Sequence, residues 1–293
     1  MEFIPQISGC TAGPLGIVHL PRFWFKMRAH AVGVLPDGYR HGTGGSDGDL
    51  LDTFGIDEAA FEAYIAREAP SYQACEGWIR ANARNLEPAT IETFNEDTVS
   101  FQMPDPRRSE WSARFGITET GYDLAIGLNQ LDDWDALHNA LLDSTAEDGP
   151  VVPAISSSIR GPLGIPHLPR LWFKHRLSGV GRLIDGYRHG TGGFDELLTT
   201  AIGLDGAAFA AYVESEQPSY LDAEAWVRAN ATTLTPETVG AVTTRMLNAN
   251  LPDVQLPARL AELGITDPSF TRGIALNDLD DWAGLHRQLL AVR

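Results

Sequence analysis

The chain has 293 residues, with 39 Asp and Glu against 22 Lys and Arg for a formal net charge of -17, and 43% of its residues are hydrophobic. This hydrophobic content can fill a buried core, which excludes a disordered chain, and the length suits one large domain or two smaller ones. The negative charge argues against nucleic acid and anionic membrane surfaces as partners.

The sequence contains an internal repeat. A shift of 148 positions aligns residues 8–142 with 156–290 without a gap, and 65 of these 135 positions are identical. We call these segments the first and the second repeat. Their identity predicts a tandem duplication.

We expect the first domain at 1–145, a short linker at 146–155, and the second domain at 156–293. The linker prediction rests on a polar stretch followed by Gly and Pro. Retention between the repeats is uneven, since 27 of the 38 positions in 13–50 are identical to their partners. Polar residues kept in both repeats are therefore the first candidates for a site.

Helices dominate the predicted elements. Residues 20–32 read as a helix with Pro21 in its first turn and Gly33 after its end. Residues 34–40 read as a tight turn or short hairpin, and Asp57 as the N-cap of the next helix.

Further helices are expected at 71–82 and 88–98, and in the second repeat Thr235 caps a helix whose first turn holds a proline. Asp132 and Asp133 are expected to begin the last helix of the first repeat. The fold class is therefore mainly α, with two homologous helical domains in tandem, each with a short glycine-rich turn or hairpin. By analogy with isologous dimers we expect pseudo-two-fold packing, as a monomer with an internal pseudo-dimer or as a homodimer.

The first retained motif joins His19, Leu20, Pro21 and Arg22 to Trp24, Phe25 and Lys26, and it recurs 148 residues later. On a helix Arg22 and Lys26 share a face, where like charges repel. Keeping this pair twice implies a compensating anion. That anion is either a carboxylate or phosphate of a ligand, or an internal Asp or Glu in a salt-bridge network, and the sequence leaves both alternatives open.

The second motif is the glycine-rich stretch from Asp37 to Asp47, with Tyr39, Arg40 and His41 before the glycines. Closely spaced glycines can turn successive N–H groups to one side and so form an anion-binding nest. The stretch fits neither the Walker nor the dinucleotide fingerprint. A purely structural turn with Asp47 capping the next helix is the alternative, although it does not explain why the polar residues are also kept.

The third motif places Trp134 and His138 four residues apart after two acids. Asp133 and His138 are five apart, about 140° around a helix, so they do not form a helical zinc motif. Helix capping by Asp132 or Asp133 is the stronger interpretation. A metal ion held by His19, His41 and His138 is a further alternative, ranked below a site for an organic ligand.

At these residues the sequence resembles the domain-of-unknown-function family 5069, whose small bacterial members carry a His-Leu-Pro-Arg motif followed by a lysine and a glycine. The resemblance rests on residues 19–22, Lys26, Gly33 and residues 54–57, and on the same elements in the second repeat. It covers about the first half of each repeat. The glycine-rich loop departs from the family pattern. The resemblance implies a fold unit and a motif but no reaction.

The retained residues predict a cytoplasmic, cofactor-independent enzyme of the lyase, isomerase or cyclase type that acts on a small anionic metabolite. We expect no signal peptide and no membrane span, since the first residues lack a basic segment and the sequence has no apolar run of about 18 residues, and the two cysteines suit a reducing compartment. The candidate catalytic residues are Lys26, His41, His19 and Tyr39 with their counterparts Lys174, His189, His167 and Tyr187. The candidate substrate-binding residues are Arg22, Arg40, Thr43, Gly44, Trp24 and Phe25 with Arg170, Arg188, Thr191, Gly192, Trp172 and Phe173.

Lys26 and Lys174 lead this hypothesis because they are the only lysines among 22 basic residues and occupy equivalent positions. An amine of lowered pKa can act as a base or form a Schiff base. The first alternative is a non-catalytic protein that binds a small ligand or a partner. The second is a metal-dependent enzyme that uses the paired histidines, although no metal ligand and no cofactor is assigned. Ser46 against Phe194 and Gly48 against Glu196 suggest that the two sites are not equivalent.

Overall fold

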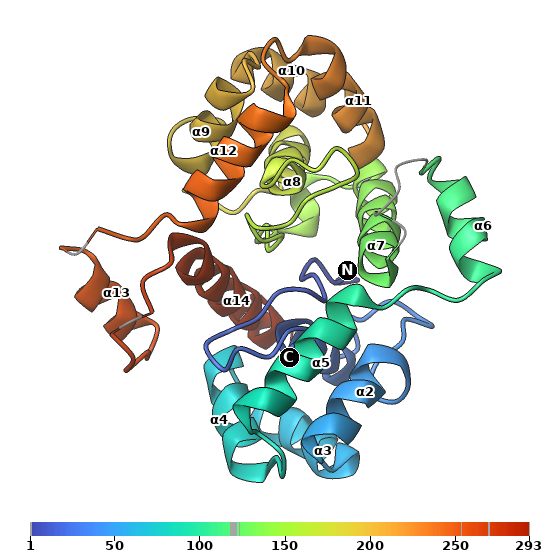
Figure 1. Cartoon of the computed structure of the whole chain (residues 1–293), viewed down its shortest axis with the longest axis vertical. Helices are drawn as coiled ribbons and strands as arrows, with labels where there is room; N and C mark the ends of the chain where they lie inside the picture. Colours follow the sequence, from blue (N-terminus) through green and yellow to red (C-terminus); the bar gives the residue numbers. More distant parts are fainter. Residues whose placement is uncertain (1, 118–121, 123, 253, 269, 293) are drawn as a thin grey trace. The chain divides into compact units, whose positions relative to one another are not determined.

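The computed structural model describes residues 2–117, 122, 124–252, 254–268 and 270–292 (Figure 1). Among these residues it contains fourteen α-helices, one 3-10 turn and no β-strand beyond isolated bridges. The prediction of a mainly α protein is confirmed. Residues 34–40 form a turn, in which Tyr39 N donates to Pro36 O at 3.0 Å. In the described part of the chain, no helix has the length and apolarity needed to span a bilayer.

The helices of the first repeat follow the predicted start and stop signals closely. The side chains of Asp57 and Ser71 cap two of them by accepting from backbone N–H groups. Pro21 lies in the first turn of another. The bounds are α1 Leu20–Ala31, α2 Gly45–Phe54, α3 Glu58–Glu68, α4 Tyr72–Asn82, α5 Pro88–Ser100, α6 Arg107–Arg114 and α7 Ala125–Leu142.

The second repeat forms the same succession of helices. Thr235 and Thr238 make a reciprocal capping box ahead of Pro236, as the sequence predicts for a capped start. The bounds are α8 Leu168–Gly179, α9 Gly193–Ala201, α10 Gly206–Glu216, α11 Tyr220–Asn230, α12 Pro236–Leu247, α13 Leu256–Glu262 and α14 Gly273–Ala291. The 3-10 turn η1, Ala146–Asp148, lies between the two repeats.

The chain divides into two compact units that do not coincide with the two repeats. Unit 1 contains Met1–Asn129, Asp253–Phe270 and Leu279–Arg293, and unit 2 contains Gln130–Pro252 and Thr271–Asp278. Helices α7 and α14 therefore each contribute residues to both units. The contiguous boundaries at 1–145 and 156–293 stay a prediction about the sequence repeats.

Helix α1 lies at the centre of the core of unit 1. Its Phe23 stacks on Phe61 of α3 with ring centroids 4.8 Å apart, and its Trp24 meets Tyr72 of α4 edge to face at 5.6 Å. Trp282, from the second repeat, also meets Tyr72 edge to face, with ring centroids 4.5 Å apart. The core of unit 1 therefore needs a tryptophan from the second repeat.

Unit 2 has the same arrangement, but here the additional tryptophan comes from the first repeat. Trp172 of α8 contacts Tyr220 of α11 at 5.5 Å, and Trp134 of α7, from the first repeat, contacts Tyr220 at 4.4 Å. Each such aromatic pair adds about 1 kcal/mol beyond the burial of its area. The retained tryptophan of the third motif thus completes an aromatic core within each unit.

The prediction that Asp132 and Asp133 begin a helix is wrong. Helix α7 starts at Ala125, so both acids lie in its interior, and α14 likewise starts ahead of its pair at Gly273. The residues between 125 and 131 are mostly apolar and helix-compatible, so the helix extends upstream of the acids. Asp133 and Asp281 are buried side chains of a helix interior and cannot serve as N-caps.

Candidate functional site

The retained lysine of unit 1 lies in a buried cluster of charges. Lys26 Nζ is 2.7 Å and 2.6 Å from the two carboxylate oxygens of Asp47, and also donates to Arg40 O at 3.3 Å. His19 Nε2 donates to Asp47 Oδ1 at 2.7 Å. All three side chains are at least nine-tenths buried. The cluster joins the start of α1 to the first turn of α2.

The same cluster forms in unit 2. Lys174 Nζ lies 2.5 Å and 2.6 Å from the oxygens of Asp195, and His167 Nε2 donates to Asp195 at 2.6 Å. Two further contacts extend this cluster. Ser157 Oγ lies 2.9 Å from His167 Nδ1, and Gly190 N donates to Asp195 Oδ2 at 2.7 Å. Asp195 thus fastens the glycine-rich loop directly to the buried cluster.

Burial and pairing set the protonation states of these clusters. Burial lowers the pKa of His19 and that of His167, the latter to about 4, so both rings are neutral at pH 7. Burial alone would raise the pKa of Asp47 and Asp195. The hydrogen bond from the histidine and the charge of the lysine outweigh burial, so both carboxyls have a pKa below the usual value. Each cluster therefore holds an ionised aspartate between an ammonium and a neutral imidazole.

The anion that compensates Lys26 is thus internal. Two carboxylate oxygens within 2.7 Å stabilise the protonated amine. The alternative of Asp47 as a helix cap is wrong as well. Gly44 is the N-cap of α2 without any side-chain cap, and Asp47 turns inward from the first turn of the helix. An aspartate in the first turn of a helix can interact either with the N–H groups of the helix N-terminus or with a nearby cation. A buried ammonium is the stronger partner of the two.

Arg22 and Tyr39 form a second buried contact. The guanidinium donates to Ile7 O at 2.8 Å and to the Tyr39 hydroxyl, and lies 5.9 Å from the centre of the tyrosine ring. Arg170 and Tyr187 repeat the arrangement in unit 2. These arginines are engaged with the protein itself, so they position the glycine-rich loop rather than present a charge to solvent.

Trp24 and Phe25, predicted as walls of a binding pocket, lie in the core. Both are fully buried, and Trp24 Nε1 donates to Pro70 O at 3.0 Å. Trp172 and Phe173 are buried in the same way in unit 2. Aromatic side chains on several faces of one helix pack on every side because α1 and α8 run through the interior.

The glycine-rich loop places the remaining retained residues at the surface. Gly42, Gly44 and Gly45 all have positive φ, between 56° and 76°, which a residue with a Cβ rarely adopts. Arg40 and Thr43 are exposed beside them. A Cβ on Gly45 would lie 3.0 Å from Arg40 Nη1, so the guanidinium rests against the first turn of α2. The loop therefore combines an exposed cation with the start of a helix.

The loop of unit 2 differs in one contact. Gly192 N, ahead of α9, donates to Glu196 Oε2 at 3.0 Å. Residue 48, the counterpart of Glu196, is glycine and has no side chain with which to make this bond. In unit 2 an internal carboxylate thus accepts from the backbone N–H that precedes the helix.

Retained Gly13 and Gly161 have a packing explanation. A Cβ on Gly13 would lie 2.3 Å from Cε1 of Tyr72 and 2.5 Å from Oε1 of Glu76. Tyr72 donates to Glu76 at 2.6 Å, and Leu15 N donates to the same carboxylate at 3.0 Å. Only glycine permits this close approach. The turn before α1 is therefore fixed by a buried acid.

The third motif contacts the first motif of the other repeat. In unit 2, His138 of α7 accepts from the buried Arg176 of α8 through both Nδ1 and its carbonyl oxygen, each at 3.2 Å. Gln217 also accepts from Arg176. In unit 1, Arg28 lies near enough to His286 to lower its pKa, after the larger effect of burial. The retained histidine of this motif thus faces a buried arginine.

The structure does not gather His19, His41 and His138 into one set. His19 is bound to Asp47, His41 stacks on His30 with centroids 3.7 Å apart, and His138 belongs to unit 2. A different contact joins His175 of α8 to Glu214 of α10, with Nδ1 2.9 Å from Oε1. Neither residue is among the predicted site residues, because their counterparts are Met27 and Ala66 and retention gave no signal. The signal available was their joint appearance in one repeat.

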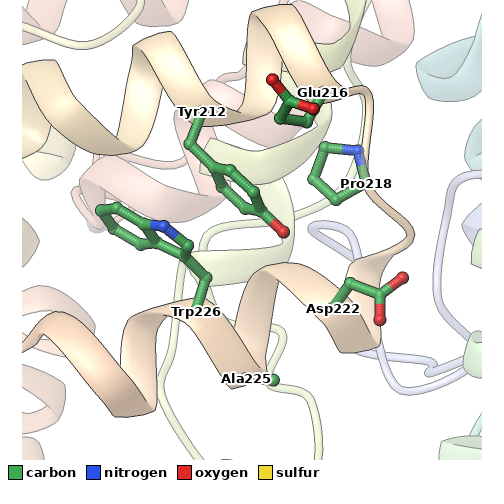
Figure 2. Close-up of a pocket in the computed structure, with 6 residues that line it drawn as sticks. All are labelled: Tyr212, Glu216, Pro218, Asp222, Ala225 and Trp226. Atoms are coloured by element: carbon green, nitrogen blue, oxygen red, sulfur yellow. The ribbon is translucent and has the colours of Figure 1, made fainter.

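A shallow depression of about 520 Å³ lies between α10 and α11 (Figure 2). Tyr212 and Trp226 stack in it with centroids 5.2 Å apart, and Glu216 and Asp222 lie exposed at its rim. None of the predicted site residues lines it. Because its charged groups are acidic, it does not suit an anionic ligand.

Comparison with known proteins places one part of the chain. Residues 14–119 match the family described as a domain of unknown function (DUF5069), which confirms the resemblance in the first repeat and extends it beyond residue 57. No curated protein and no solved structure matches the chain. Lys26, Asp47 and the glycine-rich loop all lie within the matched residues. The chain therefore contains a DUF5069-like unit in its first repeat.

Proposed function

We propose that this protein binds a small anion, a carboxylate or a phosphate, at the glycine-rich loop of unit 1. The ligand would be held by Arg40, Thr43 and the backbone N–H groups around Gly44 and Gly45. This proposal corresponds to the alternative of a non-catalytic protein that binds a small ligand. It differs from the predicted enzyme in that the lysine positions the loop and does not react.

The buried cluster supports this division of roles. Lys26 donates to the carbonyl of Arg40 and to Asp47 in the first turn of α2, so it ties both ends of the loop to α1. A Schiff base requires a neutral amine, whereas both oxygens of Asp47 favour the ammonium form. The same lysine is thus well placed to hold a loop and poorly placed to act as a nucleophile.

The single observation that carries the proposal is the bond from Gly192 N to Glu196 Oε2 in unit 2. It is a carboxylate bound by the N–H of the residue that precedes the helix, where backbone donors and the helix dipole favour negative charge. Arg188 lies nearby, with Nη1 3.4 Å from a Cβ built on Gly193. In unit 1 the loop keeps the same glycines and arginine, but residue 48 supplies no carboxylate.

The charge of the surroundings sets the expected strength. Asp49 and Asp52 are exposed on α2, and the chain carries a net charge of -17. Both oppose an incoming anion, so binding of a simple ion should be weak and should weaken further with added salt. A natural ligand would gain affinity from groups beyond its anionic end.

The test uses substitutions that the chain itself supplies. Gly48→Glu should introduce into unit 1 the carboxylate that Glu196 provides in unit 2 and should abolish phosphate binding there. A Cβ at residue 48 meets its nearest atom at an ordinary 3.7 Å, so the helix tolerates the change. Glu196→Gly should free the second loop. Titration with inorganic phosphate, followed by backbone amide NMR shifts, should show one responsive loop in the wild type, none in the first variant and two in the second.

Arg40→Gln gives the matched control, since it removes the exposed charge but leaves residue 48 unchanged. It should weaken phosphate binding in unit 1, whereas Arg188→Gln should not. Phosphate shifts in the loop of unit 1 that persist unchanged in Gly48→Glu would show that the loop is not the binding site.

We further propose that a tandem duplication produced the two units and that they retain pseudo-two-fold symmetry. Residues 148 positions apart make the same bonds, as in the pairs of Lys26 with Asp47 and Lys174 with Asp195. The aromatic contacts of Trp282 and Trp134 are equivalent as well.

A further inference from the structure

Unit 2 contains a group of side chains that unit 1 lacks. His175, His189 and Glu214 each offer one ligand atom, and these atoms lie within 4.8 Å of one another. His175 belongs to α8, His189 to the glycine-rich loop and Glu214 to α10. Two nitrogen donors and a carboxylate are thus brought together from three segments of the same unit.

The two histidines are held in defined orientations. His189 Nδ1 lies 3.2 Å from Tyr187 O, and a carbonyl can only accept, so Nδ1 carries the proton and Nε2 keeps its lone pair. That lone pair accepts from the Ser178 hydroxyl at 3.3 Å, which a bound metal would displace. Metal-binding histidines commonly donate their second nitrogen to a backbone carbonyl in this way. His175 is held by Glu214 through Nδ1. A cation between His175 and Glu214 would replace the proton that they now share.

Packing alone does not explain His175. It is 2% exposed, and its Nε2 is buried without a hydrogen bond from any described residue. The counterpart Met27 fills the same position of α1 with an apolar side chain at 3% exposure. An imidazole with one unsatisfied nitrogen is a costly substitute for a methionine in such a place. The contact of its other nitrogen, Nδ1, with Glu214 accounts for its presence better than core packing does.

Glu214 changed together with His175. Its counterpart is Ala66, so the second repeat carries both members of a contacting pair and the first repeat carries neither. His189, by contrast, is kept in both repeats as His41 and His189. Two substitutions therefore add a second imidazole and a carboxylate beside the retained loop histidine.

We propose that unit 2 binds a divalent transition metal of the zinc class through His175, His189 and Glu214. Two histidines and one glutamate form a known type of zinc ligand set, in which three protein ligands leave a fourth position open to water or substrate. Tetrahedral ligand atoms about 2.1 Å from zinc lie roughly 3.4 Å apart. The ligand atoms now lie within 4.8 Å of one another, so the widest separation must close by up to about 1.4 Å, while His175 Nδ1 and Glu214 Oε1, 2.9 Å apart, must open by about 0.5 Å. His189 and Glu214 are only partly buried, which leaves them free to make that adjustment around the fixed His175.

This inference is independent of anion binding in unit 1, because no residue is shared between the two sites. The experiment uses the full chain, without an affinity tag that binds metal, after treatment with a chelator. Calorimetric titration with Zn²⁺ should show one ion bound per chain. His175→Met and Glu214→Ala, which restore the residues of the first repeat, should each lower the affinity by more than the roughly 10- to 100-fold typical of an outer-shell change.

His30→Ser and His41→Ala are the matched controls, since they alter the stacked histidines of unit 1 and should leave zinc binding unchanged. Circular dichroism and the thermal midpoint without metal check that each variant folds. Glu214 is partly exposed, so its variant remains informative even if His175→Met fails to fold. Visible absorption of bound Co²⁺ should show a four-coordinate site with nitrogen and oxygen ligands. An absence of Zn²⁺ binding, wild-type affinity in Glu214→Ala, or loss of binding in His41→Ala would overturn the proposal.

Discussion

The two glycine-rich loops share one support and differ in what surrounds them. In both units a buried lysine, aspartate and histidine hold the loop, with the same bonds to the same atoms. Around the second loop, however, the sequence adds Glu196 at the start of α9 and the pair of His175 and Glu214 beneath it. The support is thus common to the units, while the chemistry beside it is particular to each.

This difference shows how retention should be interpreted. Two kinds of residue are kept. The lysines, aspartates and histidines of the clusters are buried and bonded within the protein, whereas Arg40 and Thr43 are exposed on the loop. The residues that changed, such as Gly48 against Glu196 and Met27 against His175, alter the groups beside the loop. Retention therefore identifies the loop and its support, and divergence identifies what differs beside them.

The largest expected effect concerns the common support. Asp47→Ala and Asp195→Ala each leave a buried ammonium without its carboxylate, and loss of one partner of a buried pair costs about 3–5 kcal/mol. Urea denaturation followed by circular dichroism should show losses of this size for both variants. The double variant Lys26→Met with Asp47→Leu removes both charges and should recover most of the loss in unit 1. A loss of unfolding free energy below about 1 kcal/mol in Asp47→Ala would mean that the buried pair of Lys26 and Asp47 does not stabilise unit 1.

Acid should reveal the histidine of the support. The pKa of His167 is about 4 in the folded protein, against an ordinary value of 6.5, because the ring is buried. The unfolded chain therefore binds more protons between these values, so stability is lost as the pH falls from about 6.5 to about 4. The loss from this residue is at most about 3 kcal/mol.

The carboxyl of Asp195, whose pKa is lowered, stays ionised through this window. His167→Gln and His19→Gln should each flatten the dependence of unfolding free energy on pH, measured by urea denaturation at pH 4.5 and 7. An unchanged slope in His167→Gln would show that this ring titrates normally in the folded state.

A smaller effect is expected at the buried arginine of unit 2. Gln217 accepts from Arg176, whose pKa burial lowers to about 10, while the counterpart of Gln217 is Ala69. Gln217→Ala should destabilise by about 1–3 kcal/mol, since a buried guanidinium loses an acceptor. Thermal unfolding measures this change. His138 remains as a second acceptor, so His138→Ala combined with Gln217→Ala should cost more than either alone.

The smallest expected effect distinguishes the two histidines of the support. Ser157 lies 2.9 Å from His167 Nδ1, whereas glycine occupies the equivalent position 9. Ser157→Gly should cost about 1 kcal/mol through the lost hydrogen bond. Denaturation midpoints of the variant and the wild type provide the comparison, and a gain in stability would contradict the assigned bond.

Sequence reasoning predicted the helices well because their signals are local. Asp57, Ser71 and Thr235 cap helices as their positions indicate, and the internal repeat identified the polar residues that meet in the buried clusters. It could not say that Asp47 turns toward Lys26, because 21 residues separate the two side chains and only the folded loop between α1 and α2 brings them together. His175 and Glu214 were missed for the same reason, since 39 residues separate two side chains that only the packing of α8 on α10 brings together.

The exchange of tryptophans between the repeats has a consequence for how the chain can be divided. Expressed alone, residues 1–145 would lack Trp282, and the aromatic cluster around Tyr72 would have an unfilled place. A half-length chain would have to fill it with Trp134 of α7, which in the full chain packs on Tyr220 instead. The two halves should therefore fold and unfold together. Heat or denaturant should unfold the whole protein in one cooperative transition, in which neither half stays folded after the other has unfolded.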